Sequence, residues 1–189
     1  MCLLSISVGT ASAQVKKGYI DLGFGGFLGW SESDFGTGAS QQRFIGANIG
    51  SLYFVTDHIA VGGSANLSYI DRENADVWLY GLGPAFDYHF RPAEDIVPLV
   101  GLTAGITRSE SDLDSGRTAS DNGWFAEVHG GADFFLNDHV ALNLLLRVRR
   151  SRREIEQQLG GMPQRFNIRT DDVGIVVGIS IFIDTKKGR

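Results

Sequence analysis

No apolar run in the sequence approaches the roughly 18 residues that a transmembrane helix needs, so a helical membrane anchor is excluded. Positive charge is also scarce: the formal net charge is −5 at pH 7, which argues against nucleic acid as a partner. The four histidines and the single cysteine lack the close spacing of zinc ligands, so the sequence predicts neither a metal site nor a cofactor.

The single cysteine, Cys2, lies in the segment 1–13, MCLLSISVGTASA, which predicts a signal peptide. This apolar run ends in an A-x-A-like cleavage site, but it lacks a positively charged start, as a truncated signal would. A disordered apolar N-terminus is the alternative. Cleavage after Ala13 would leave no thiol to mispair in an oxidising periplasm. We expect residues 14–189 to form one β-domain with a short periplasmic C-terminal tail.

Strict alternation of apolar and polar residues is what the sequence has in abundance, and it is clearest in the stretch 123–150. In its first half, Trp124, Val128 and Phe134 occupy even positions, while Glu127 and Asp133 lie at odd ones. The second half alternates in the same way after a tight turn at 137–138. Successive side chains of a β-strand point to opposite faces, so this stretch predicts a hairpin with one apolar and one polar face.

About eight segments from residue 17 onward alternate in this way, which is enough for one all-β domain. They lie at about 18–30, 43–55, 59–69, 77–90, 97–107, 123–136, 140–150 and 172–183. Between them, tight turns near Asp57, Glu94 and Asp138 alternate with longer polar loops at 31–42, 108–122 and 151–166. Outer-membrane β-barrels have this asymmetry, with short periplasmic turns and long extracellular loops.

The direction in which the apolar face points separates two fold classes. A soluble sandwich or lipocalin would bury that face and expose Glu127, His129 and Arg147 to water. An outer-membrane barrel turns the apolar face to lipid and the polar face to its lumen. The polar face consists of Gly, Ser, Asn, Asp, Glu, His and Arg, which can fill a narrow eight-stranded barrel. We therefore expect an all-β, eight-stranded, antiparallel, up-and-down transmembrane β-barrel with a closed polar lumen.

Aromatic residues on the apolar face favour the membrane interpretation, because such side chains prefer the membrane–water interface. The three tryptophans lie at strand ends next to the long loops, and other aromatic residues lie near the opposite ends. In a strand tilted by about 40°, the stretch from Trp124 to Phe134 would span about 25 Å, which fits a bilayer. The pattern predicts two aromatic girdles, formed by Trp30, Trp78 and Trp124 and by Tyr53, Tyr88, Phe90 and Phe134.

Ionisable residues gather on the polar face of the predicted barrel. A catalytic interpretation would make Glu127 a general base that His129 orients. No nucleophile or oxyanion donor accompanies them, and buried charges need partners, so a structural ion-pair network is favoured. We expect Glu127 to lie level with Arg147 or Arg149. The predicted members of this network are Asp21, Asp87, Glu127, His129, Asp133, Arg147 and Arg149, with His89 on the same face.

An internal repeat relates two of the tight turns: YFVTDHIAV at 53–61 matches FFLNDHVAL at 134–142 position for position. Two similar hairpin turns under the same interface constraint are sufficient to explain it. The histidines of the repeat, His58 and His139, begin a strand on the periplasmic side. We expect them to be residues of the rim and not ligands.

The segment 147–153, RVRRSRR, is an unusual concentration of charge. It is explained equally well as the solvated end of a strand, neutralised by acidic residues such as Glu110 and Asp121 in the preceding loop. Guanidinium groups also bind phosphate in a bidentate manner, which makes Arg150, Arg152 and Arg153 candidates for contact with lipopolysaccharide phosphates. Both interpretations stay open from the sequence.

The stretches YFVTDHIAVGG, VPLVGLTAGI, GGADFFLNDHVALN and GIVVGISIFI resemble the small outer-membrane β-barrel family. This family includes the OmpA- and OmpX-like transmembrane domains and the opacity-type surface proteins, and the resemblance covers about residues 17–183. It implies a last strand that the barrel-assembly machinery reads as a β-signal, with Gly178, Ile181 and Ile183 at its glycine and apolar positions. Members often end on an aromatic residue, whereas this chain continues through 184–189.

These observations predict a monomeric, integral outer-membrane protein of the Gram-negative cell envelope. Its expected role is structural or one of surface interaction, in adhesion or envelope integrity, and not enzymatic. A small porin-like channel is the first alternative, and a lipid A-modifying enzyme is a weaker one. The expected partners are outer-membrane lipid, lipopolysaccharide, the barrel-assembly machinery and an unidentified host or surface ligand.

Overall fold

The computed structural model describes residues 15–34, 39–72, 75–90, 95–113, 117–159 and 162–185, so the predicted signal peptide and the end of the tail lie outside it. Each strand pairs antiparallel with its neighbours in sequence, and β8 pairs with β1, which closes the sheet into a barrel. This confirms the predicted fold. The strands are β1 (Tyr19–Asp34), β2 (Ala39–Phe54), β3 (Ile59–Arg72), β4 (Ala75–His89), β5 (Ile96–Leu113), β6 (Arg117–Asn137), β7 (Val140–Leu159) and β8 (Met162–Asp184).

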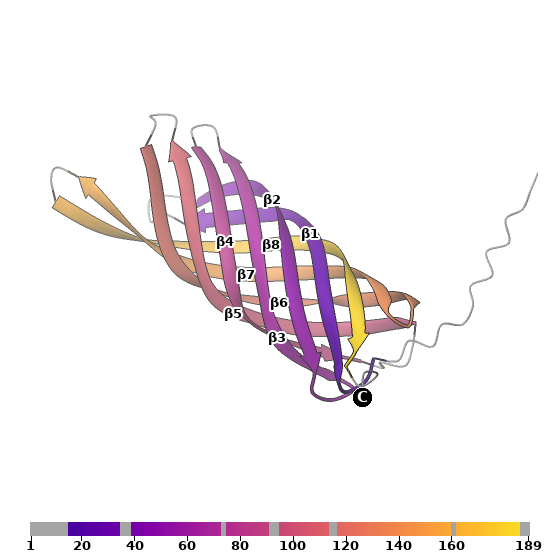
Figure 1. Cartoon of the computed structure of the whole chain (residues 1–189). Helices are drawn as coiled ribbons and strands as arrows, with labels where there is room; N and C mark the ends of the chain where they lie inside the picture. The colour runs from indigo at the N-terminus through magenta and orange to yellow at the C-terminus, as the bar shows by residue number, and fades with distance from the viewer. Residues whose placement is uncertain are drawn as a thin grey trace, which may run out of the picture.

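Several strands are far longer than a bilayer requires. β7 has 20 residues and β8 has 23, whereas a tilted transmembrane strand needs about 9–11. Their ladder continues to the pair Leu159↔Met162, and the β7–β8 hairpin extends away from the barrel at the end opposite the C-terminus (Figure 1). No helix in the described part of the chain is long and apolar enough to cross a membrane.

The predicted loops at 31–42, 108–122 and 151–166 are therefore wrong in extent. Only 35–38, 114–116 and 160–161 separate the strands there. These segments are mostly polar, so they show no alternation of apolar and polar residues that would predict a strand. Backbone hydrogen bonds nevertheless form a ladder whatever the side chains are. Pro163 is accommodated within the ladder, opposite Gln158.

The apolar face points away from the barrel axis, as the membrane interpretation requires. Ile106 is 69% exposed, Val177 60% and Leu82 59%. In a soluble barrel such side chains would be the buried core, and a continuous apolar surface of this extent marks contact with another phase. On β8 the outward apolar positions run from Ile183 back to Val173, and the polar Asp171 and Arg169 follow.

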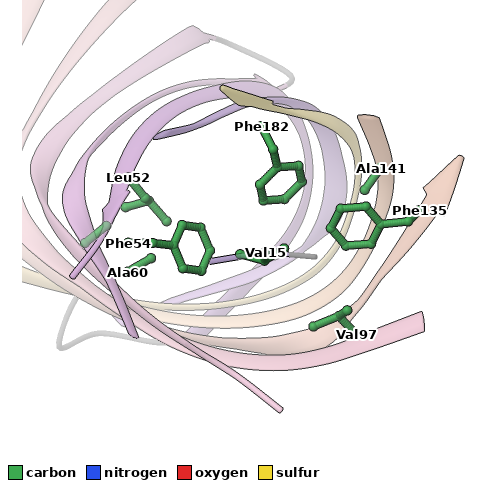
Figure 2. Packing of buried hydrophobic residues seen from close by; sticks show 9 residues of the cluster. Val15, Leu52, Phe54, Ala60, Val97, Phe135, Ala141 and Phe182 are labelled. Atoms are coloured by element: carbon green, nitrogen blue, oxygen red, sulfur yellow. The ribbon is translucent and has the colours of Figure 1, made fainter. Parts of the chain in front are cut away.

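The interior is not as polar as the sequence suggested, and this corrects the expectation of a uniformly polar lumen. At the end with the short turns, apolar side chains from seven strands, β2 to β8, and from the segment before β1 converge on the axis (Figure 2). We call this cluster the periplasmic plug; it consists of Val15, Leu52, Phe54, Ala60, Ala85, Val97, Phe135, Ala141 and Phe182. A second apolar cluster lies nearer the outer end and consists of Phe27, Phe44, Ile70, Val77, Leu79 and Val176.

Interior glycines make room for the large side chains across the barrel. A Cβ on Gly101 would collide with the Asp87 carboxylate and with the ring of His129. A Cβ on Gly46 would collide with the Phe27 ring. The glycine-rich face therefore accommodates both the charged residues that the sequence placed there and the aromatic ones that it did not.

Candidate functional site

An internal cavity of about 110 Å³ lies in the middle of the barrel. We call it the mid-lumen cavity. Its wall includes carboxylates, amides and hydroxyls, together with apolar side chains such as Leu52 and Leu99. Six of the seven residues predicted for the ion-pair network line it, namely Asp21, Asp87, Glu127, His129, Asp133 and Arg147.

Glu127 and Arg147, which both line this cavity, form an ion pair. Arg147 Nη1 lies 3.6 Å from Glu127 Oε2, and the guanidinium also lies over the Phe27 ring, 3.7 Å from its centroid. The Arg147 side chain is 3% exposed, so it is surrounded by an aromatic ring and a carboxylate instead of water. Glu127 is level with Arg149 in the ladder, but its ion pair is with Arg147.

Two histidine–aspartate contacts cross the lumen between β4 and β6. His129 Nε2 donates a hydrogen bond to Asp87 Oδ1 at 3.0 Å, and its Nδ1 lies 3.9 Å from Glu127. His89 Nε2 lies 3.4 Å from Asp133 Oδ2, and both of these side chains are 1% exposed. These contacts connect β4 and β6 across the inner face of β5, the strand between them.

A chain of polar groups continues from Asp133 along the neighbouring strands. Asn143 Nδ2 donates to Asp133 Oδ1 at 2.6 Å and lies 3.3 Å from Ser180 Oγ. Ser180 in turn bonds Asp21. Asp21 is 7% exposed, and its Oδ1 makes no hydrogen bond within the described residues.

Arg149 lies inside the barrel, as predicted, with Glu127 and Asp172 as its cross-strand neighbours, but its hydrogen-bond partners are neutral. Its guanidinium donates to Asn66 Oδ1 at 2.6 Å and to Thr107 Oγ1 at 3.3 Å. It also lies over the Phe125 ring, 4.1 Å from its centroid. The guanidinium thus makes its direct contacts with an amide, a hydroxyl and an aromatic face, and none of its hydrogen bonds in the described residues is to a carboxylate.

Arg153 is also inside the barrel, which corrects its assignment to the lipopolysaccharide-contacting set. Its side chain is 5% exposed and its Nη1 lies 3.6 Å from Asp121 Oδ2. Asp121 Oδ1 accepts a hydrogen bond from Ser109 at 2.7 Å. Because β7 continues through this position, residue 153 keeps the inward direction of 147 and 149.

Arg150 and Arg152 point outward, beyond the last apolar position of β7. Arg150 is held by a bidentate pair, with Nε 2.6 Å and Nη2 3.1 Å from the two oxygens of Asp171. This hydrogen bond holds the pKa of Asp171 below its usual range. Arg169, which the sequence analysis missed, lies opposite Arg152 in the ladder and 3.4 Å from Asp171.

All seven residues of the predicted girdles lie on the outer surface of the barrel. The three tryptophans are exposed, with Trp30 at 57%, Trp124 at 50% and Trp78 at 38%. Among the remaining four, Tyr53, Phe90 and Phe134 are exposed and Tyr88 is half-buried. Tyr88 stacks on His58, with ring centroids 5.8 Å apart. Contact of these rings with lipid stays a prediction.

The two histidines of the internal repeat join a turn to the neighbouring strand. His58 Nδ1 donates to the carbonyl of His89 at 2.9 Å, and His139 Nδ1 donates to the carbonyl of Phe182 at 3.0 Å. In each case the backbone N–H of the acceptor residue donates to the histidine carbonyl. The repeat therefore has a structural role at the periplasmic rim, as its position predicted.

The chemistry of the lumen is that of a packed, hydrogen-bonded interior. Glu127 and His129 are neighbours, but within the described part of the chain the His129 ring contacts the carboxylates of Asp87 and Glu127 and hydrogen-bonds no serine or cysteine. In that same part of the chain, no group of three His, Cys, Asp or Glu side chains is arranged to hold a metal ion. The arrangement can hold charges and bind a small polar molecule.

Comparison with known proteins identifies a family and solved structures that share this architecture. The family model described as outer membrane protein beta-barrel domain matches residues 1–180. Neisserial surface protein A has a similar structure: it is 14% identical, the TM-score is 0.59, and 87% of this chain and 97% of that chain are covered.

Two further solved structures share the fold. OprG from Pseudomonas aeruginosa is 13% identical, with a TM-score of 0.56 over 90% of this chain and 98% of its own. Ail, the attachment invasion locus protein of Yersinia pestis, is 13% identical, with a TM-score of 0.52 over 88% and 99%. No curated protein sequence matches the chain. The closed eight-stranded wall, its outward apolar surface and the match over residues 1–180 show that the chain belongs to the outer-membrane protein β-barrel family.

Proposed function

We propose that the protein is a structural and surface-interaction component of the outer membrane of a Gram-negative bacterium, with a lumen that does not conduct. The observation that carries this proposal is the periplasmic plug, where Phe54 is 0%, Phe182 1% and Phe135 8% exposed. Phe135 and Phe182 lie 4.9 Å apart, and Phe54 lies 6.2 Å from Phe182, measured between ring centroids. A small channel would need a continuous aqueous path past these rings.

Conductance of single barrels in planar bilayers tests the closed lumen. The native protein is expected to give no stable conductance steps. A variant with Phe54→Ala, Phe135→Ala and Phe182→Ala removes three rings from the plug, and steps are expected to appear or grow. Heat-modifiable migration on an unboiled gel would verify that the variant folds. Stable steps from the native protein would favour the porin-like alternative.

The outer part of the barrel supports the surface role. On β7 the outward apolar positions end at Val148, and ten or so residues continue the strand beyond them. Catalysis is not proposed, because the ionisable groups of the lumen face one another and lie behind the barrel wall. A changed lipid A profile in cells that lack the protein would contradict this point.

Lipopolysaccharide is the partner that we propose for the outer surface. Arg152 and Arg169 are direct cross-strand neighbours, and like charges in that arrangement destabilise a sheet unless an anion lies between them. Trp124 is the partner of Arg152 on the other side, which places both arginines at the level of the outer girdle. A lipid A phosphate can accept bidentate hydrogen bonds from each guanidinium.

Replacement of both arginines by glutamine tests this contact. In bilayers that contain lipopolysaccharide, Arg152→Gln with Arg169→Gln should lower the thermal stability of the barrel relative to the native protein. In bilayers whose lipid A lacks phosphates the double variant should be at least as stable as the native protein, because it loses the repulsion between the two guanidinium groups. Arg108→Gln is the matched control, because that outward guanidinium lies opposite Tyr80 and Asn122 in the ladder and not opposite another arginine. Equal losses in both bilayers would remove the phosphate contact.

The barrel-assembly machinery is the second proposed partner, acting through β8. Ile181 and Ile183 are exposed on the outward face, and Gly178 lies on the inward face of the same strand. Replacement of Ile181 and Ile183 by serine is expected to lower the amount of folded barrel in the outer membrane. Unchanged insertion would assign recognition to another segment.

A further inference from the structure

The charges around the mid-lumen cavity do not balance. Four carboxylates line it, those of Asp21, Asp87, Glu127 and Asp133, whereas Arg147 is the guanidinium among the residues of its wall. With both nearby histidines, His89 and His129, counted as charged, four negative groups would face three positive ones. With both histidines neutral, four negative groups would face one positive group, the Arg147 guanidinium. Excess charge in a protein interior needs compensation by a partner.

Three oxygen atoms in this region accept no hydrogen bond from the described residues. They are Asp21 Oδ1, Asn48 Oδ1 and Asp133 Oδ2, and each is buried. Asp133 Oδ2 lies 3.4 Å from His89 Nε2 without a hydrogen bond between them. Buried polar atoms are normally paired. Nitrogen atoms of His89 and Arg147 nearby are also buried without a hydrogen-bond partner. The three oxygens themselves are acceptors, so the group that completes them has to be a donor.

The rest of the wall selects among donors. Leu52, Leu99, Leu145 and Val176 also line the cavity, which gives it an apolar side next to the carboxylates. Its volume of about 110 Å³ is several times the roughly 10–15 Å³ that one water requires. A bare metal ion is a poor fit, since the described residues contain no cluster of ligands for one.

We propose that the mid-lumen cavity is a binding site for a small primary alkylammonium ion. The ammonium group donates hydrogen bonds to Asp21, Asn48 and Asp133 and supplies the missing positive charge. Its alkyl group lies against Leu52 and Leu99. The periplasmic plug borders the cavity through Leu52 and Ala85, and the outer apolar cluster borders it through Val176.

Equilibrium folding in detergent micelles tests the site, with methylammonium chloride as the probe. The folding equilibrium constant, from urea titration, is expected to rise about tenfold when the probe reaches ten times its Kd. Tetramethylammonium chloride at the same ionic strength and pH carries the same charge without N–H donors, and no rise is expected. An equal effect of both salts, or no effect of either, would overturn the proposal.

Variants then locate the site. Asp21→Asn removes one negative charge and supplies a donor of its own, so this variant should fold and lose most of the methylammonium response. Asp138→Asn, in the exposed turn between β6 and β7, should keep the response in full. Asn48→Ala tests the same cavity from β2 and should also weaken the response. A response that survives both cavity substitutions would place binding elsewhere and refute this site.

Discussion

Arg147 shows at the scale of one residue how the lumen holds charge. Its guanidinium is almost fully buried between the Phe27 ring and the Glu127 carboxylate. Glu127→Ala would leave this charge without its carboxylate, and removing one member of a buried ion pair costs about 3–5 kcal/mol. We expect urea unfolding in micelles, followed by tryptophan fluorescence, to show a loss of about 3 kcal/mol.

Two controls separate the ion pair from other effects of the substitution. Glu32→Ala removes an exposed carboxylate from the outward face of β1, where a change within about 0.5 kcal/mol is expected. In an Arg147→Met background, Glu127→Ala should cost much less, because no buried cation is left unpaired. An unfolding midpoint that Glu127→Ala leaves unchanged would show that the network does not stabilise the barrel.

The alternation of odd and even positions along each strand predicted correctly which residues face the lumen, but it could not predict which of them pair with one another. Glu127 is the ladder partner of Arg149, yet it pairs with Arg147, because side chains lean along a strand and choose among rotamers. Arg153 was misplaced for another reason. The sequence analysis ended the strand near residue 150, whereas the same parity carried three residues further would have predicted its inward direction.

The hairpin turns at the periplasmic rim show how one element is attached to the next. His139 holds the β6–β7 turn to β8 through its Nδ1–H bond to the Phe182 carbonyl. His139→Ala should destabilise the barrel by about 1 kcal/mol, the usual net worth of one hydrogen bond. The measurement is again urea unfolding, and Asp138→Ala in the same turn serves as the control.

The internal repeat extends this prediction to the second turn. His58→Ala should cost a similar amount, since His58 makes the equivalent bond to His89. The two turns share no partners, so the losses should add in the double variant. A double variant as stable as the native protein would show that the two histidine hydrogen bonds do not stabilise the barrel and that the repeat has no role in its stability.

The β7–β8 hairpin determines where trypsin can cut the folded protein. A loop at 151–166 would be cut by trypsin, but the ladder pairs Arg150 with Asp171 and Arg153 with Ile168. Proteases act on chain that can leave its hydrogen-bonded structure. Trypsin should therefore spare Arg150, Arg152 and Arg153 in folded protein in micelles, and cut them in heat-unfolded protein. Fragment masses would identify the sites, and rapid cleavage of folded protein would show that the hairpin frays.

At the scale of elements, the sequence predicted the strands better than what fills the barrel. Phe54, Phe135 and Phe182 occupy the alternating positions that face the lumen, where most neighbours are polar. From the alternation alone, an apolar residue at such a position could equally be an isolated exception or part of an aromatic plug. Their common position near the periplasmic strand ends was the available signal. The outer ends of the strands were predicted as loops, because their polar side chains show no periodic apolar pattern. The backbones of these strand ends nevertheless pair along their length.

The whole molecule is a barrel with an apolar outer surface, and we predict that the two aromatic girdles set its position in the bilayer. Trp30, Trp78 and Trp124 come from β1, β4 and β6, so a common depth would define the outer interface around much of the barrel. Variants that keep one tryptophan each, with the other two replaced by phenylalanine, should be quenched with the same depth profile by lipids brominated at different acyl positions. Aqueous acrylamide should quench all three weakly. Three different depth profiles would show that the barrel is tilted or that the girdle is incomplete, and strong quenching by acrylamide would place the tryptophans in water, outside the bilayer altogether.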